Sequence, residues 1–415
     1  MRKLYIAPGC AALPSESAFR LLNARFSGRC MFPNLLELEW CNKYRERHLL
    51  HIFQLAVSQS LTDFKLSLHD ASYVPTVLSA LAPAHSSLRS IYIALSDPEL
   101  AQEFSTLLFK CTPHRLCNFA IDAPVSRAAF LHASQLPNLR YLEVKAIQAD
   151  GSEHDEAQLP TTMFPSLRYL CVGELCANSI WLPSLKRIDS KNLVGLVLKL
   201  KNVGAARTAL HLRALKDLQP RGLHRTLTML AIDCKDNFSG LEVNRATVEH
   251  LLPLTQLTSL AISFTCGLNQ CGHKLSDEDL ELLVKAMPEL EDLTLGETPC
   301  SIPADNSIKS LVAIAEHCKH LRQLSIHVNV GASITGPPVA GPPDVEGPTL
   351  RNHDLVECPL RIVTFGPCLI PSGEKGVHTF ASTLLRLFPR LHTVAGSGNP
   401  QWDLVRSVVA ASSCW

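Results

Sequence analysis

A six-residue pattern of apolar and variable positions recurs along almost the whole chain. In each copy a leucine is followed by two variable residues, an aliphatic residue, one more variable residue and a final aliphatic or aromatic residue. The copies begin at Leu35, Leu61, Leu88, Leu116, Leu139, Leu167, Leu193, Leu227, Leu257, Leu290, Leu321 and Leu360, with a degenerate copy at Leu391. Subtracting the residue numbers of successive copies gives steps of 23 to 39 residues, which is a period typical of a solenoid.

Each copy is too short for a surface helix, and its centre alternates as a β-strand does. In the copy that begins at Leu139, Leu142 and Val144 are expected to face a core, while Tyr141 and Glu143 face the other way. One such strand cannot bury its apolar side alone, so successive copies are expected to stack into a parallel sheet. The pattern is typical of leucine-rich repeats. It predicts an α/β leucine-rich-repeat solenoid, with a curved parallel sheet of about twelve or thirteen strands on its concave side and with helices and irregular segments outside.

The segments between the copies carry helix signals. Ser276 and Asp279 form a variant of the capping box, and apolar residues follow them at helical spacing. Residues 307–319 and 377–388 show the same spacing. The alternative fold, a doubly wound α/β enzyme, predicts strands of more continuous valine and isoleucine and a glycine-rich first turn, and neither is present. The buried set is expected to include the central leucine of each copy, namely Leu142, Leu170, Leu260, Leu293 and Leu324.

The repeat predicts one solenoid over residues 1–415, with about 12–13 irregular repeats. Residues 331–348 are dense in glycine and proline and are expected to form a flexible insertion. Residues 396–415 are expected to close the last repeat, because Trp402 and Val405 recur at helical spacing. Residues 1–6 resemble a strand copy, so the chain is expected to begin within a repeat.

Composition narrows the function classes. The formal net charge of +1 gives no argument for a nucleic-acid partner or a membrane surface. The 15 cysteines are scattered singly without shared spacing, so we expect reduced thiols and not a disulfide framework. Pro8 and Gly9 interrupt the short apolar start, which makes a poor signal peptide. No stretch reaches the ~18 apolar residues of a membrane span. We therefore expect a cytoplasmic or nuclear protein without membrane contact.

No motif for catalysis or for a cofactor is found. The chain has no glycine-rich phosphate loop and no HExxH. Cys266, Cys271 and His273 lie close together, but their spacing fits no common zinc site. His317 and His320 are expected at a helix end, where they face the negative end of the dipole. We therefore expect no enzyme, no catalytic residue, no metal and no cofactor.

The concave face offers variable positions to a protein partner. Tyr92, Tyr141 and Tyr169 are expected to be exposed on adjacent strand positions, between inward aliphatic residues of their own copies. Tyrosine is enriched at interface hot spots. The predicted protein-binding residues are Tyr92, Tyr141, Glu143, Tyr169, Asp292 and Gln323.

The chain resembles the leucine-rich half of F-box proteins, particularly the large fungal set. The resemblance covers nearly the whole chain and rests on the irregular repeat length and the F/L-P-x-L segments before strands. Its closing stretch runs from Leu384 to Val394 with Trp402 and Val405, and its early part includes residues 19–23 and 32–40. The F-box itself is not found: Leu13-Pro14-Ser15-Glu16 echoes its opening, but Gly28 and Pro33 break the helices that should follow.

In that family the F-box binds a cullin-linked adaptor and the repeats hold the substrate of a ubiquitin ligase. The resemblance therefore implies a non-catalytic scaffold that recognises ligase substrates, with ligase machinery as a partner only if an F-box lies upstream of Met1. The alternative is a ribonuclease-inhibitor-like regulator that blocks an enzyme through its concave face. The mixed residues at the variable positions do not favour the strongly acidic face that such an inhibitor presents to a basic target.

Overall fold

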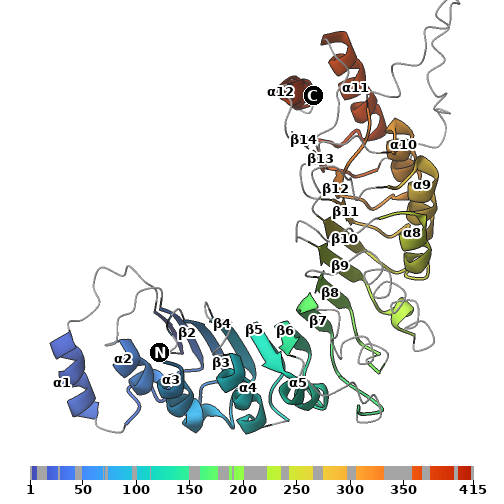
Figure 1. Ribbon diagram of the computed structural model, residues 1–415. Coiled ribbons are helices and arrows are strands. Elements are labelled where there is room, and N and C mark those ends of the chain that lie inside the picture. Colours follow the sequence, from blue (N-terminus) through green and yellow to red (C-terminus); the bar gives the residue numbers. More distant parts are fainter. Residues whose placement is uncertain are drawn as a thin grey trace, which may run out of the picture. The chain divides into compact units, whose positions relative to one another are not determined.

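The computed structural model describes residues 2–6, 16–26, 29–42, 49–68, 70, 73–95, 101–112, 114–148, 159–175, 187–188, 191–200, 222–234, 243–264, 274–296, 305–330, 358–366, 374–396 and 401–412. Its contacts divide the chain into two compact units, Met1–Leu193 and Val194–Trp415 (Figure 1). Each unit is described by itself.

The described residues of the first unit form seven strands that pair in sequence order, and every pair is parallel. The strands are β1 (Lys3–Ile6), β2 (Glu37–Asn42), β3 (Asp63–Leu68), β4 (Ser90–Leu95), β5 (Asn118–Ser126), β6 (Tyr141–Gln148) and β7 (Tyr169–Leu175). The helical segments are α1 (Glu16–Phe26), α2 (Leu49–Ala56), α3 (Val74–Leu81), the 3₁₀ turn η2 (Ala82–Ala84), α4 (Ala101–Lys110) and α5 (Arg127–Ser134). A helix follows most strands, which makes each repeat a strand and a return segment.

The second unit repeats this arrangement with seven strands, again parallel and in sequence order. The strands are β8 (Gly195–Leu200), β9 (Met229–Cys234), β10 (Ser259–Phe264), β11 (Asp292–Leu295), β12 (Gln323–Ile326), β13 (Ile362–Phe365) and β14 (Thr393–Gly396). The helical segments are the 3₁₀ turn η6 (Leu223–Arg225), α8 (Arg245–Leu251), α9 (Asp277–Ala286), α10 (Ile308–His317), α11 (Glu374–Leu387) and α12 (Gln401–Ser412). Figure 1 shows α8 to α11 along one side of these strands.

The strand predictions are confirmed. Each of the thirteen copies forms a strand, and residues 3–6, which resemble a copy, form the fourteenth strand of the described residues. The α/β class with parallel strands in sequence order is therefore established, while the assignment to leucine-rich repeats stays a prediction. The inserted residues 331–348 lie outside the described part of the chain.

The core of both units is built from the apolar positions of the copies. Leu142, Leu170, Leu260, Leu293 and Leu324 are all at most 2% exposed, as predicted. The leucine that opens each copy is buried as well, for example Leu139 and Leu290. Burying one such side chain contributes about 1.5–3 kcal/mol, so the repeated leucines hold each strand against the helices behind it.

Capping side chains fix the starts of several helices. At α9, Ser276 Oγ accepts a hydrogen bond from the Asp279 backbone N–H (3.2 Å), and an Asp279 carboxylate oxygen accepts one from the Ser276 N–H (3.2 Å). This is the predicted capping box. Asp277 accepts hydrogen bonds from the backbone N–H and the hydroxyl of Ser307, the N-cap residue of α10. Neighbouring helices of the second unit are thus joined at their first turns.

The last described repeat is covered by α12. Trp402 and Val405 are buried, and the Trp402 ring stacks on Phe365 with centroids 5.1 Å apart. A Cβ atom on Gly396 would lie 2.2 Å from the Trp402 ring. Only glycine lets β14 approach the indole this closely, so the two residues form one closing contact.

Candidate protein-binding face

The strand register sorts the side chains on the face opposite the leucines into rows, and most of these side chains are exposed or partly exposed, whereas Ala120 and Cys171 are buried. A row here consists of residues at the same position of successive copies, paired across the strands. The first row of the first unit is Lys3, Glu37, Asp63, Ser90, Asn118, Tyr141 and Tyr169. Its middle row is Tyr5, Glu39, Lys65, Tyr92, Ala120, Glu143 and Cys171. These rows stand between the buried positions, on the face opposite the leucines.

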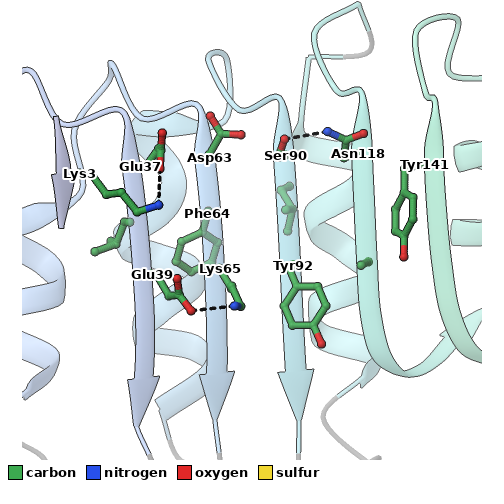
Figure 2. A pocket seen from close by; sticks show the side chains of 13 residues that line it. Lys3, Glu37, Glu39, Asp63, Phe64, Lys65, Ser90, Tyr92, Asn118 and Tyr141 are labelled. Atoms are coloured by element: carbon green, nitrogen blue, oxygen red, sulfur yellow. Dashed lines mark hydrogen bonds and ion pairs between the residues drawn. The ribbon is translucent and has the colours of Figure 1, made fainter. Parts of the chain in front are cut away.

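The two rows of the first unit enclose a shallow hollow of about 250 Å³. Figure 2 shows its polar side chains standing on β1 to β6, with the ring of Tyr92 beside Lys65 and with Tyr141 near the other end. Phe64 and Ile91 form part of its floor. The hollow therefore combines an apolar floor with charged and aromatic walls.

Ion pairs organise the charged end of this hollow. Lys65 Nζ lies 2.7 Å from Glu39 Oε1, and Lys3 Nζ lies 2.9 Å from Glu37 Oε2. The hydrogen bond to Glu39 raises the pKa of Lys65, although partial desolvation acts against it. Lys65 Nζ also lies 5.7 Å from the Tyr92 ring centroid, within cation–π range. Tyr92 is thereby oriented while 40% of its surface stays exposed.

Tyr141 and Tyr169 form an aromatic pair at the other end. They occupy the same register position on β6 and β7, and their ring centroids are 6.4 Å apart. The Tyr141 hydroxyl donates a 2.6 Å hydrogen bond to Glu143 Oε2. Burial, followed by this hydrogen bond, raises the pKa of Tyr141. Tyr169 remains 41% exposed. The ring of Tyr141 is therefore held in place by its neighbours, while the ring of Tyr169 is accessible to a partner.

The predicted arrangement of the three tyrosines is wrong in one respect. Tyr92 belongs to the middle row of β4, whereas Tyr141 and Tyr169 belong to the first row of β6 and β7. Ala120 of β5 separates Tyr92 from the strand of Tyr141. Tyr141 is also only partly exposed, because it packs beside Tyr169 and Glu143. The tyrosines are therefore one pair and one separate ring.

The other predicted residues form a second group. Asp292 and Gln323 are directly paired on β11 and β12, in the first row of the second unit. Asp292 is partly buried and Gln323 is exposed. The structure thus brings Tyr141, Glu143 and Tyr169 together and places Asp292 beside Gln323. Lys65 and Glu39 occupy variable positions of successive copies, but the sequence did not predict their ion pair and the predicted binding residues do not include Lys65.

The described residues show no group of three or more His, Cys, Asp or Glu side chains that could hold a metal ion. Cys266, Cys271 and His273 lie outside these residues. Eight cysteines are described, and all are free thiols. In the same part of the chain, no helix has the length and apolar character needed to cross a membrane. The face is chemically suited to contact by polar, ionic and aromatic groups.

No protein-family model and no curated protein matches this chain.

Proposed function

We propose that the protein is a non-catalytic leucine-rich-repeat scaffold that binds a protein partner on the exposed sheet face of its first unit. The observation that carries the proposal is the Tyr141–Tyr169 pair beside the hollow of β1 to β6. Rigid aromatic rings give large contact area with few rotatable bonds. Paired charges at the other end of the hollow, such as Lys65 with Glu39, supply directional contacts.

The resemblance to F-box proteins supports a more specific role. On this basis the bound protein is a substrate presented to a ubiquitin ligase, and the present chain is the recognising part. The rival role, a ribonuclease-inhibitor-like block of an enzyme, gains less support from this face. Its rows carry Glu37, Glu39, Asp63 and Glu143 against Lys3 and Lys65, and ion pairs engage two of the four acids. An inhibitor of a basic enzyme needs a more strongly acidic face than this.

Site-specific photo-crosslinking tests the binding face. A benzoylphenylalanine replaces Tyr169, and a matched control carries it at Phe109, an aromatic residue of α4 that is 48% exposed. We expect a discrete protein adduct from position 169 in cell extract and none of the same mass from position 109. Adding the Tyr92→Ala substitution is expected to weaken the adduct. Identical adducts from both positions, or none from position 169, would contradict the proposal.

The role in ubiquitylation has its own test. Mass spectrometry of the adduct identifies the partner protein. The half-life of this partner is then measured in cells with and without the protein described here. A ligase substrate is expected to live longer when the protein is depleted. An unchanged half-life together with increased enzymatic activity of the partner would favour the inhibitor role instead.

A further inference from the structure

Exposed arginines border the sheet of the first unit just before the first row, and three of them directly precede β4, β6 and β7. Arg89, Arg140 and Arg168 each occupy the second position of a copy. The Arg168 N–H donates to the Arg140 carbonyl oxygen (2.8 Å), and the Arg140 N–H donates to the Cys117 carbonyl oxygen (2.7 Å). Neighbouring strands are ~4.8 Å apart, so Arg140 and Arg168 start from adjacent points. We call Arg89, Arg140 and Arg168 the arginine edge.

The arginine edge is not neutralised within the described residues, where none of its three side chains takes part in an ion pair. The described turns and strand starts around it, residues 85–90, 114–118, 137–141 and 165–169, contain no Asp or Glu, and they add the exposed Arg115. The second unit differs at the same position. There Arg322 Nη1 lies 3.5 Å from Glu291 Oε2, and His320 Nε2 lies 3.6 Å from Glu289 Oε2.

The arginine edge also adjoins the aromatic pair. Tyr141 directly follows Arg140 and Tyr169 directly follows Arg168, so the two exposed arginines and the two rings of the pair lie at the starts of the same neighbouring strands, β6 and β7. The Tyr141 hydroxyl is already committed to Glu143. The side chains of Arg140 and Arg168, which precede the two tyrosines, have no ion-pair partner among the described residues. A single guanidinium binds a carboxylate in a bidentate fork geometry, and an aromatic ring can pack against an apolar side chain.

We propose that the arginine edge and the Tyr141–Tyr169 pair bind an acidic, extended segment of the protein partner. Carboxylates of this segment pair with Arg140 and Arg168, and an apolar residue between them rests on the tyrosines. This inference rests on the proposed function and names the chemistry of the partner. A short protein segment fits better than nucleic acid, because its carboxylates can be confined to the arginine edge. The continuous phosphates of a nucleic-acid strand would also run past Glu143, Glu39 and Asp63, which repel them.

Fluorescence anisotropy with defined probes tests the charge requirement. The probe is a fluorescein-labelled peptide, Gly-Glu-Glu-Phe-Glu-Glu-Gly, and its control replaces every Glu by Gln. We expect the full-length protein to bind the acidic peptide, to bind it more weakly as salt increases, and to ignore the glutamine peptide. The double variant Arg140→Glu/Arg168→Glu is expected to bind roughly tenfold more weakly. Arg140→Lys/Arg168→Lys is expected to lose less, because charge survives while the fork is lost.

The second unit offers a matched control. Arg322 and Arg361 hold the same position on adjacent strands, since the Arg361 N–H donates to the Arg322 carbonyl oxygen (3.0 Å). Arg322→Glu/Arg361→Glu should leave peptide binding unchanged. Circular dichroism and the urea midpoint check that all variants stay folded. Equal losses in both double variants, or binding of the glutamine peptide as tight as that of the acidic one, would overturn the inference.

Two further arms separate the remaining explanations. A labelled short oligothymidylate that binds more tightly than the acidic peptide would show a nucleic-acid surface and would overturn the inference. If benzoylphenylalanine at position 169 captures a partner but the peptide does not bind, the inference fails and the proposed function stands. If neither the adduct nor peptide binding is seen, both fail. Peptide binding that the Arg140 and Arg168 reversals weaken roughly tenfold, together with an adduct at position 169, supports both.

Discussion

The two units share their buried positions but differ in repeat length and in what they expose. Up to Leu193, successive copies are 23 to 28 residues apart, whereas from Leu193 onwards they are 30 to 39 apart. The change coincides with the boundary between the units. The same leucine positions are buried in both units. The core therefore determines where the strands lie, and it tolerates return segments of different length.

The exposed middle rows show the sharper difference. In the first unit this row consists of Tyr5, Glu39, Lys65, Tyr92 and Glu143, together with the small and buried Ala120 and Cys171. In the second unit the corresponding row consists of small or short side chains, namely Val197, Ala231, Ala261, Thr294, Ser325, Thr364 and Ala395. The first unit thus presents large polar and aromatic side chains at positions where the second unit has only small ones.

The largest effect should come from the positions that the units share. Leu142→Ala in the first unit and Leu293→Ala in the second should each lower the free energy of unfolding by about 2–5 kcal/mol, because both side chains are buried. Urea denaturation followed by circular dichroism measures the loss. Thr294→Ala, in the partly exposed middle row, is the control and should cost less than ~0.5 kcal/mol. Losses below ~1 kcal/mol at both leucines would contradict the assignment of these positions to the two cores.

Helix starts provide a smaller test of the comparison. Ser276→Ala removes one half of a reciprocal capping box in α9, whereas Ser126→Ala removes a single bond to the Ala129 N–H in α5. We expect a loss of about 1–2 kcal/mol for the first and about 0.5–1 kcal/mol for the second. Asparagine at position 276 should restore most of the loss, as it also caps helices. Equal urea midpoints for the two alanine variants would contradict this ranking.

The tyrosine pair predicts a pH effect confined to the first unit. The pKa of Tyr141 is raised in the folded state, so folding favours the neutral phenol. The stabilisation that Tyr141 contributes is therefore complete below its unfolded pKa, near about 10. It is lost as the pH rises through the folded pKa. Tyr141→Phe should cost about 0.5–1 kcal/mol at neutral pH through the lost hydrogen bond to Glu143. The cost should shrink above about pH 10. Ultraviolet titration should show one late tyrosine that the variant lacks.

The smallest effect concerns Asp292 in the second unit. Burial, and then the neighbouring Glu291, raises its pKa against the opposing effect of Arg322. The folded state therefore favours the protonated acid, and this contribution, present below the unfolded pKa, is lost as the pH rises. Asp292→Asn should raise the urea midpoint slightly at neutral pH and not at acidic pH. Asp63→Asn, at a first-row position of the first unit where Thr62 donates a 2.7 Å hydrogen bond, should give no such gain.

The strands were predictable because the repeated leucines report burial directly. Ser276 and Asp279 likewise announced the start of α9. The relation of the tyrosines was predicted wrongly because spacing within one copy does not compare copies: Tyr92 is the fifth residue of its copy, and Tyr141 is the third. The arginine edge, at the second residue, is visible only after the copies are aligned. The pairing of Lys65 with Glu39 depends on side-chain rotamers, which periodicity does not specify.

The sequence order of the strands also bears on how the chain folds. Each strand needs only the preceding strand of its unit as a template, and consecutive copies are 23 to 39 residues apart. Loop-closure entropy grows with the logarithm of length, so this range changes the cost of adding one strand by only about 0.5 kcal/mol. Spatial order equals the order of synthesis. During translation, each new strand can therefore pair with the exposed edge of the strand synthesised just before it. Early strands need not stay unpaired until translation ends.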